Sequence, residues 1–338
     1  MSFTIHLQPS GKQFVAEPNE KILEAALRQG ITLPYSCRNG SCGTCKAELI
    51  AGEVDYGSYE DKAMSQVERA AGKVLLCQAQ ARSDATVAAH ELATPAGIVI
   101  RTLPARVIQR EPLAHDVMRL QLKLPENQLL AYLPGQYIDV LLKDNQRRSF
   151  SIANPPNAEQ TLELHVRHVP GGSFTDHVFN TMKERDLLRF RGPLGIFFLR
   201  EDSPRPILLI AGGTGLAPIK SIVEHAFAAN IQRPMHLYWG ARAQRDLYLH
   251  ELAQSWAQTH PPFQYTPVLS EPPTKEGWSG RRGFVHEAVL AEYADLSGFD
   301  VYASGPPPMI EAVKGSFFAR GLPPEQLYYD SFEFSHAL

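Results

Sequence analysis

Four cysteines constrain this chain more than any other feature of its sequence. Cys37, Cys42 and Cys45 follow the spacing C-x4-C-x2-C. The fourth, Cys77, lies further along, and the 338 residues contain no other cysteine. This is the ligand spacing of plant-type [2Fe-2S] clusters, in which four thiolates hold two iron ions. Two glycines inside the loop permit tight turns that point backbone N–H groups at the cluster sulfurs, so the sequence predicts such a cluster.

Two other roles for four cysteines are disfavoured. A chain of 338 residues that is 44% hydrophobic does not have the composition of a small disulfide-stabilised scaffold. A structural zinc site usually combines two short C-x2-C pairs, whereas this chain has one dense loop and a distant single cysteine. With all four thiols bound to iron, we expect a reducing, cytoplasmic setting.

Charge and hydropathy exclude further functional classes. The net charge of −3 leaves no basic excess for nucleic acid. No stretch approaches the roughly 20 apolar residues that span a membrane, and residues 1–6 lack the charged and apolar regions of a secretory signal. The length predicts two or three domains.

The first elements of the chain follow a simple order. Alternating apolar residues at 3–7 and around Phe14 predict a β-hairpin. A helix is expected next, with Asn19 as its N-cap and Gly30 at its end. After the cysteine loop, residues 47–50 are expected to form a strand.

This order is that of the β-grasp fold, and residues 1–92 resemble plant-type ferredoxins along their whole length. The resemblance implies a [2Fe-2S] ferredoxin domain in which the apolar run 74–79 carries Cys77 from the core side. Acidic residues on this segment form either an ordinary solvated face or a docking surface for an electron acceptor. They are Glu53, Asp55, Glu60, Asp61 and Glu68.

A linker is expected at 88–97, and a run of short strands follows in residues 98–202. Loops that contain Pro, Gly and Asn separate these strands, a pattern typical of an antiparallel barrel or sandwich. The expected strands are Ala105–Arg110, Val117–Leu124, Tyr137–Leu142 and Leu162–Arg167.

Two motifs in this segment suit a ligand that carries phosphates and a flat ring. In the motif Arg-Ser-Phe-Ser at 148–151, the arginine can neutralise a pyrophosphate and the aromatic ring on the same strand face can cover a flat ring. The second hydroxyl can hydrogen-bond a ring nitrogen. The motif Gly-Gly-Ser at 171–173 opens an expected helix, whose free N–H groups suit phosphate oxygens. Each motif alone is weak evidence, and their order carries the argument.

That order resembles the FAD-binding barrel of the ferredoxin–NADP reductase superfamily. The resemblance implies that Arg148 meets the FAD pyrophosphate, Phe150 stacks on the flavin, and Ser151 hydrogen-bonds near its N5 atom. Many relatives have Tyr in place of Phe150, so stacking is retained here and a phenolic hydrogen bond is lost. The other implied contacts are Ser149 in the same motif, His165 and Arg167 at the isoalloxazine edge, and Gly171, Gly172 and Ser173 at phosphate.

Residues 203–338 alternate strands and helices, which predicts a doubly wound α/β domain. Helices are expected at 219–229 and 247–256. The buried strand at 207–211 leads into the turn 212–218, which matches the usual dinucleotide fingerprint only in part. Pro218 stands where a third glycine is expected, and the second strand ends at Arg242 without the acid that binds a ribose.

The turn instead resembles the G-G-T-G-x-x-P turn of the nicotinamide domain in the same superfamily. Residues 304–309 resemble its C-G-P-x-x-M loop beside the nicotinamide, with Ser304 in place of the cysteine. Ser151 and Ser304 are therefore the catalytic candidates. Phe332, in an aromatic tail, is expected either over the flavin or in the core. The other implied nicotinamide contacts are Gly213, Thr214, Gly215, Gly305 and Met309.

The electron donor is expected to be NADH, because relatives with this domain order mostly use it, and NADPH stays open. Arginines that could lie near the adenosine half are either solvated or form a clamp for a 2′-phosphate. They are Arg242, Arg245, Arg281 and Arg282.

Together the segments look like the reductase components of multicomponent oxygenases, and several motifs are most similar to CDP-deoxyglucoseen reductases. Nicotinamide releases two electrons as a hydride, whereas a [2Fe-2S] cluster accepts one, so a flavin has to stand between them. The resemblance implies a multidomain oxidoreductase with α+β, β and α/β parts. It would pass electrons from NAD(P)H through FAD and the cluster to an oxygenase or dehydratase partner.

Two alternative functions remain open. One is a stand-alone NADH reductase of a small acceptor, such as a quinone or free flavin, although the ferredoxin segment would then be superfluous. The other is a redox-sensing iron–sulfur binding protein. Extra metal sites are disfavoured because the histidines lack H-x-x-x-H or H-E-x-x-H spacing, and the lack of a G-x-S-x-G motif leaves hydrolysis unsupported.

Overall fold

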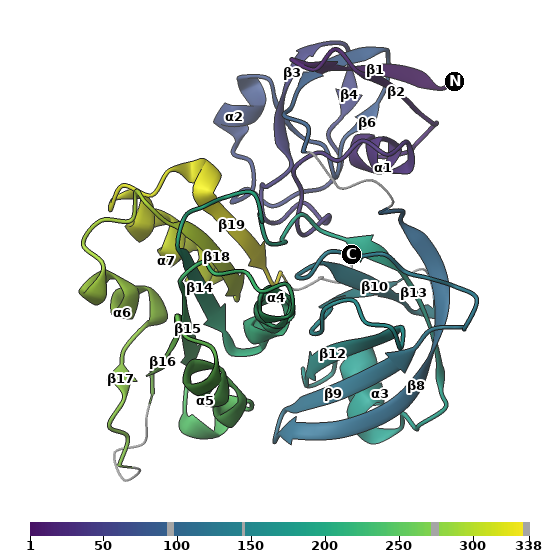
Figure 1. Ribbon diagram of the computed structural model, residues 1–338. Coiled ribbons are helices and arrows are strands. Elements are labelled where there is room, and N and C mark those ends of the chain that lie inside the picture. Colours follow the sequence, from purple (N-terminus) through teal and green to yellow (C-terminus); the bar gives the residue numbers. More distant parts are fainter. Residues whose placement is uncertain (93–97, 144–145, 272–276, 334–338) are drawn as a thin grey trace. The chain divides into compact units, whose positions relative to one another are not determined.

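The chain forms two compact units in a computed structural model (Figure 1). The first unit comprises residues 1–100 with the C-terminal end from Glu333, and the second comprises residues 101–332. The structure describes residues 1–92, 98–143, 146–271 and 277–333. Within these ranges, no helix combines the length and the apolar character that crossing a bilayer requires.

The first unit is a five-stranded mixed sheet with the strand order β2-β1-β7-β3-β5. Ile5 and Leu7 of β1 and Ile22 and Leu23 of α1 are almost completely buried in its core. The sheet strands are β1 (Phe3–Gln8), β2 (Gln13–Ala16), β3 (Lys46–Ala51), β5 (Lys73–Leu75) and β7 (Ala85–Ala88). The pair β4 (Val54–Asp55) and β6 (Gln80–Ala81) and the helices α1 (Ile22–Arg28) and α2 (Gln66–Ala70) complete the unit.

The expected elements of this unit are present, with two corrections. The hairpin β1–β2, the helix and the strand after the cysteine loop are confirmed. Asn19 is not the N-cap: Lys21 holds that position, because Asn19 adopts a left-handed backbone (φ 62°) in the preceding turn. The linker was expected from Ala88, but that residue still belongs to β7, and residues 93–97 lie outside the described part.

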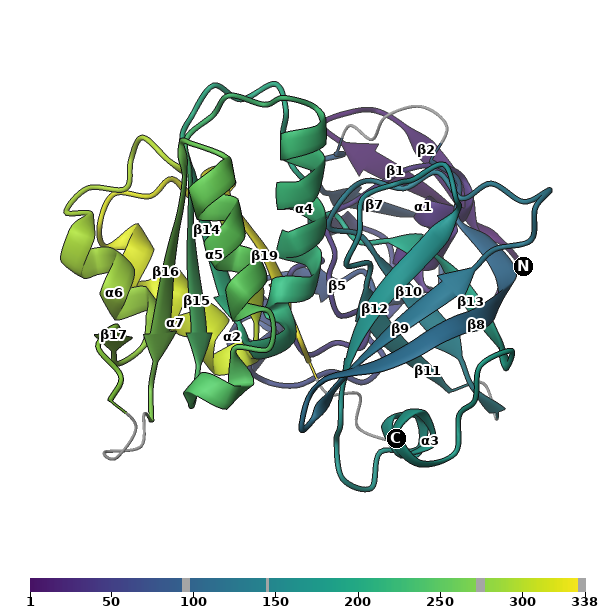
Figure 2. The same ribbon diagram turned by 60° about the horizontal axis from the view of Figure 1, so that its bottom comes forward.

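The second unit begins with a six-stranded antiparallel sheet in the order β11-β10-β13-β8-β9-β12. An isolated antiparallel bridge between Ile152 and Leu164 joins the end of β11 to β12. Helix α3 (Ser173–Asn180) lies beside these strands (Figure 2). Its residues Phe174 and Val178 belong to the core of the sheet. The strands are β8 (Arg101–Ala114), β9 (Val117–Lys123), β10 (Tyr137–Leu141), β11 (Arg147–Ser151), β12 (Thr161–Arg167) and β13 (Leu187–Leu194).

The four strands expected in this segment are confirmed, and β8 is much longer than expected. Strand β13 was missed. The apolar–polar alternation that marks a half-buried strand covers only residues 188–191, because an exposed leucine precedes it and Gly192-Pro193, a pair typical of turns, follows it.

The rest of the second unit is a parallel sheet in the order β17-β16-β15-β14-β18-β19. Leu209 and Ala211 of β14 pack toward α4 and α5, whereas Leu208 and Ile210 pack toward α6 and α7. Both faces of the sheet are therefore covered, as expected for a doubly wound domain (Figures 1 and 2). The strands are β14 (Ile207–Gly212), β15 (Met235–Ala241), β16 (Phe263–Leu269), β17 (Arg281–Arg282), β18 (Asp300–Gly305) and β19 (Leu327–Ser331). The helices are α4 (Leu216–Ala228), α5 (His250–Thr259), α6 (Val285–Glu292) and α7 (Pro307–Phe318), with short 3-10 turns η2 (Gly213–Gly215), η3 (Gln244–Asp246) and η4 (Pro324–Gln326).

Two helix boundaries differ from expectation. Helix α4 begins at Leu216 rather than Ile219, so Pro218 lies in its first turn. Proline is tolerated there, because an N–H group in the first turn has no partner within the helix. The helix expected at 247–256 begins at His250, since the turn η3 occupies the residues just before it.

Candidate functional site

The four cysteines gather around one loop of the first unit. Residues 37–45 join α1 to β3, and Cys77 lies in the turn after β5. Gly43 has a φ of 74°, and a Cβ atom there would lie 2.9 Å from the carbonyl oxygen of Ala63. Gly40 has a φ of 85° and is equally crowded by Gln78. The loop therefore needs glycine at both positions.

The thiols interact in pairs. Hydrogen bonding with Cys42, and then with Cys77, lowers the pKa of Cys37, and hydrogen bonding with Cys77 lowers the pKa of Cys45. Among the described residues, no three His, Cys, Asp or Glu side chains converge as a single metal ion requires. Hydrogen bonding with Cys37 in turn raises the pKa of Cys42 and of Cys77, so the four sulfurs interact as one group. A two-iron cluster shares four cysteines between its irons.

Hydrogen-bond donors already surround three of the sulfurs. The hydroxyl of Thr44 lies 3.2 Å from the Cys42 sulfur. The backbone N–H of Cys77 donates to the Cys45 sulfur over 3.5 Å, and the Gln78 amide donates to the Cys77 sulfur over 3.6 Å. Donors of this kind stabilise negatively charged sulfur, so the residues present fit a [2Fe-2S] cluster.

Sequence reasoning missed the ion pair that holds this loop. Arg38 lies between two cysteine ligands, is only 3% exposed, and pairs with Glu24 of α1. Its Nε donates to a Glu24 carboxylate oxygen over 3.1 Å. The available signal in the sequence was an arginine directly after a cysteine ligand. The cysteine spacing did not indicate that Glu24 would be its partner.

The predicted flavin motif forms strand β11. The Arg148 guanidinium donates to the carbonyl of Arg147 over 2.8 Å, and its side chain is half-buried. Ser149 points its hydroxyl to Asp139, 2.7 Å away. The Phe150 ring packs against Phe174 of α3 with ring centroids 5.2 Å apart. Contact of these residues with a flavin stays a prediction.

The last residue of this motif reaches across the second unit. The Ser151 hydroxyl donates to Asp330 over 3.3 Å, and both residues are buried. Asp330 lies on β19 directly beside Ser304 of β18. One aspartate, which sequence reasoning missed, thus bonds Ser151 and is the strand neighbour of Ser304. Its only signal was an acid within the aromatic tail.

The Gly-Gly-Ser turn begins α3 as expected. Gly171 has a φ of 79°, and Gly172 is the N-cap residue, followed by exposed Ser173. The Thr175 hydroxyl accepts a hydrogen bond from the N–H of Val169 over 3.1 Å. A Cβ atom on Gly172 would lie 2.7 Å from that hydroxyl. Thr175, which was not predicted, therefore holds the turn in shape, and contact of the turn with phosphate stays a prediction.

The two predicted nicotinamide loops pack directly against each other. A Cβ atom on Gly215 would lie 1.9 Å from the carbonyl oxygen of Ser304. A Cβ atom on Gly212 would lie 2.6 Å from the Met309 sulfur. The Ser304 hydroxyl is buried and has no hydrogen-bond partner among the described residues. A free buried hydroxyl beside these loops fits a nicotinamide carboxamide, which offers both donor and acceptor atoms.

Two further predicted residues lie beside these loops. The N–H of Phe332 donates to the carbonyl of Gly305 over 2.9 Å, which places Phe332 next to the second loop. The Arg167 guanidinium would be 2.7 Å from a Cβ atom on Gly213, and its Nε donates to Asp116 over 2.9 Å. Their contact with a cofactor stays a prediction, as does that of Thr214 in the same turn.

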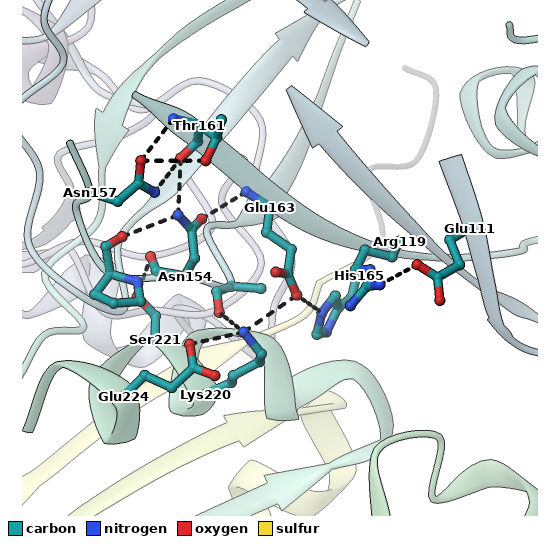
Figure 3. Close-up of polar contacts among 12 residues, drawn as sticks. Glu111, Arg119, Asn154, Asn157, Thr161, Glu163, His165, Lys220, Ser221 and Glu224 are labelled. Atoms are coloured by element: carbon teal, nitrogen blue, oxygen red, sulfur yellow. Dashed lines mark hydrogen bonds and ion pairs between the residues drawn. The ribbon is translucent and has the colours of Figure 1, made fainter. Parts of the chain in front are cut away.

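His165 lies in a buried polar network rather than on an open surface (Figure 3). One ring nitrogen is 2.7 Å from a Glu163 carboxylate oxygen, and the other is 3.0 Å from the Tyr248 hydroxyl. Both ring nitrogens therefore have partners within the protein. The expected position of His165 at the flavin edge stays a prediction, and Glu163 and Tyr248 were not anticipated.

The environment sets the charge of this network. Burial lowers the pKa of His165 more than the Glu163 carboxylate raises it. Burial alone would raise the pKa of Glu163, but the hydrogen bond with His165 and the positive charge of Lys220 hold it below its usual value. Near neutral pH, a neutral imidazole therefore faces an ionised carboxylate.

Comparison with known proteins agrees with this arrangement. Three family models match in consecutive order: a 2Fe-2S iron-sulfur cluster binding domain at 5–82, an oxidoreductase FAD-binding domain at 104–199 and an oxidoreductase NAD-binding domain at 209–315. The CDP-6-deoxy-L-threo-D-glycero-4-hexulose-3-dehydrase reductase of Yersinia pestis is 42% identical over 332 residues, which cover 98% of this chain and 99% of that protein.

Other relatives serve oxygenases. The reductase component DmpP of phenol 2-monooxygenase from a Pseudomonas species is 35% identical over 337 residues, covering 97% of this chain and 95% of that protein. The crystal structure of the Amycolatopsis cytochrome P450 reductase GcoB matches with a TM-score of 0.85 at 36% identity, over 98% of both chains.

A cluster loop in one unit and adjoining flavin and nicotinamide sites in the other define an iron–sulfur flavoprotein oxidoreductase. Its cofactors are a [2Fe-2S] cluster, FAD and NAD(P)H. The chain belongs to the ferredoxin–NADP reductase family, in the group of reductases that carry a [2Fe-2S] ferredoxin domain before the flavin domain.

The packed glycine turn yields a first test. In a Gly215→Ala variant, the added Cβ atom would collide with the Ser304 carbonyl 1.9 Å away, so the two nicotinamide loops have to separate. Because misplacement by about 1 Å can cost about 100-fold in rate, we expect flavin reduction by NADH to slow by that order. Stopped-flow absorbance measures the rate, and Gly298→Ala, which has nothing within 4 Å of its added Cβ atom, is the matched control. Wild-type rates in Gly215→Ala would contradict the assignment.

The buried histidine yields a second test. The folded-state pKa of His165 lies below its unfolded value, so the unfolded chain binds more protons and the free energy of unfolding falls as pH decreases through about 6.5. One such group contributes a slope of at most about 1.4 kcal/mol per pH unit. We expect the free energy of unfolding of His165→Gln to change less with pH than that of wild type between about pH 7.5 and 5.5.

Tryptophan fluorescence in urea follows this transition cleanly, because the three tryptophans, Trp239, Trp256 and Trp278, all belong to the second unit. His177→Gln, which removes an exposed histidine of the same unit, is the control. An equal slope in His165→Gln and wild type would mean that folding does not lower the pKa of His165.

Proposed function

We propose that this chain passes electrons from NADH, through FAD and the [2Fe-2S] cluster, to a separate protein of the deoxysugar-dehydrase type. The observation that carries the proposal is the hydrogen bond from Ser151 to Asp330, beside Ser304. It joins the end of the flavin motif to the nicotinamide loops within one unit. The greater identity to the Yersinia dehydrase reductase than to the phenol 2-monooxygenase component supports the choice of partner.

The chain's own residues would bind and orient the cofactors. When bound, FAD accepts a hydride and releases electrons singly, and the cluster carries one electron at a time. Arg148 would neutralise the FAD pyrophosphate, with the turn 171–173 at phosphate. Ser151, oriented by Asp330, would hydrogen-bond near N5, and Ser304 would hold the nicotinamide carboxamide. Cys37, Cys42, Cys45 and Cys77 would ligate the two irons.

Three domains would carry these roles, at 1–92, 98–202 and 203–338. The three family matches fall within these bounds, which supports them. We further propose that the antiparallel sheet of the middle domain closes into a barrel. The bridge between Ile152 and Leu164, which joins its two edge strands, supports that closure.

NADH is the proposed electron donor. This choice is supported by the surroundings of the four arginines that could have bound the 2′-phosphate of NADPH. Arg281 lies 3.7 Å from Glu292, and Arg245 lies 3.9 Å from Asp246, so two of the four have a carboxylate nearby. Carboxylates there would repel a 2′-phosphate.

Ion pairs within the first unit support the interpretation of its acidic residues as an ordinary solvated face. Asp55 pairs with Arg82, and Glu68 pairs with Lys46. Partner docking would then depend on other parts of this unit. The four free cysteines support a reducing, cytoplasmic location.

Replacing one cluster ligand tests the proposed electron path. In Cys45→Ser, NADH should still reduce FAD, and dyes that accept electrons from flavin should still be reduced. Reduction of the protein partner should stop, because single electrons leave through the cluster. Anaerobic NADH titration should bleach flavin and cluster absorbance in wild type, and flavin absorbance alone in the variant.

Three outcomes would reject the proposal. If dye and partner reduction fell equally in Cys45→Ser, the cluster would not be the exit to the partner. If the wild-type protein reduced a quinone or free flavin faster than any dehydrase partner, it would be a stand-alone reductase. A wild-type protein that NADH fails to bleach would instead be a redox sensor.

A further inference from the structure

A buried lysine connects the helix of the nicotinamide turn to the flavin-binding part. Lys220 of α4 is 6% exposed. Its ammonium group donates to the carbonyl of Ala153 over 3.2 Å and lies 3.4 Å from Glu163 of β12 (Figure 3). It also lies 2.9 Å from Glu224, one turn along the same helix. One cation thus holds two carboxylates and a carbonyl from three parts of the fold.

The next residue makes a parallel connection. Ser221 is completely buried, and its hydroxyl donates to the carbonyl of Asn154 over 2.7 Å. The Asn154 side chain accepts a hydrogen bond from the N–H of Glu163 over 2.7 Å and donates to the carbonyl of Thr161 over 2.9 Å (Figure 3). The segment after β11, strand β12 and helix α4 therefore form one continuous hydrogen-bonded network.

These contacts lie close in sequence to both predicted reaction partners. Ala153 and Asn154 directly follow Ser151 and Ile152, at the end of the flavin motif. Lys220 and Ser221 lie in the second turn of α4, which starts at the nicotinamide turn η2. Because an α-helix is a stiff rod, a shift at Lys220 moves the turn at its N-terminus.

The chemistry of the network indicates geometry rather than stability as its purpose. Taking charged groups out of water costs about as much as their attraction returns, so a buried ion pair is a weak source of stability. Its directional bonds, however, permit one arrangement of the three elements, whereas apolar side chains would tolerate sliding.

We propose that Lys220 and Ser221 are positioning residues for hydride transfer, which hold the nicotinamide turn at a set distance from the flavin motif. This inference rests on the proposed function. Neither residue touches the reacting atoms in this scheme. They act through helix α4 on one side and through Ala153 and Asn154 on the other.

Three variants test the proposal. Lys220→Met keeps the length of the side chain and removes its charge, and Ser221→Ala removes a single hydrogen bond. Arg233→Met is the matched control, because Arg233 is also buried (8% exposed) and ion-paired, with Asp300. Its other partners are the carbonyls of Arg200 and Arg205, so it does not contact the flavin motif or β12.

We expect Lys220→Met, with FAD and iron bound, to slow flavin reduction at saturating NADH by about 10- to 100-fold. Affinity for NAD⁺ and electron flow from chemically reduced flavin to the cluster should stay at wild-type values. Ser221→Ala should show a smaller loss in the same step. Arg233→Met should lower thermal stability and leave the rate per bound flavin unchanged.

Hydrogen–deuterium exchange provides a readout that does not depend on turnover. The N–H groups of Ile152 and Ala153 donate to Gln136 and Glu163 over 2.9 and 2.8 Å. In Lys220→Met without NADH, these amides and those at the start of α4 should exchange faster than in wild type and in Arg233→Met.

The results test the positioning role separately from the proposed function. Wild-type flavin reduction in Lys220→Met, or an equal loss in Arg233→Met, would overturn the positioning role. If Lys220→Met does not retain FAD, Ser221→Ala decides, and unchanged reduction and exchange in that variant would overturn it. A wild-type protein that NADH cannot reduce would instead reject the proposed function.

Discussion

The second unit depends on one close backbone contact, between the Gly213–Gly215 turn and the carbonyl of Ser304. No side chain fits there, since a Cβ atom on Gly215 would lie 1.9 Å from that oxygen. The contact brings the carboxyl ends of β14 and β18 together, at the edge where open parallel sheets bind ligands. Strand β19 pairs next to β18, and this register delivers Asp330 to Ser151.

Polar contacts join the flavin-binding and nicotinamide-binding parts, beside the apolar packing of Phe197 and Leu199. Lys220 meets Glu163, Ser221 meets Asn154, and Ser151 meets Asp330. Directional bonds of this kind fix the relative position of the two parts but add little to the stability of the fold. Hydride transfer needs such a fixed position, because its rate depends steeply on the distance and angle between donor and acceptor.

The cluster loop is specified more locally. The three clustered cysteines and the two left-handed glycines lie on the loop itself. The hydrogen-bond donors Thr44 and Gln78 lie on the loop and directly after the fourth ligand. The pair of Arg38 with Glu24 ties the loop to the neighbouring helix α1. One-electron chemistry requires little motion of this kind of site, so a short, rigid loop is sufficient.

The sequence alone determined the cofactors, the order of the domains and both glycine turns, because ligand spacing and left-handed backbone positions depend on neighbours along the chain. It could not determine β13, whose alternation Gly192 and Pro193 interrupt, nor the true cap of α1. Only the tertiary structure decided that Asp330 meets Ser151 and that Lys220 meets Glu163. These partners are far apart in the chain, and which of them meet depends on how strands and helices pack to bury their apolar faces.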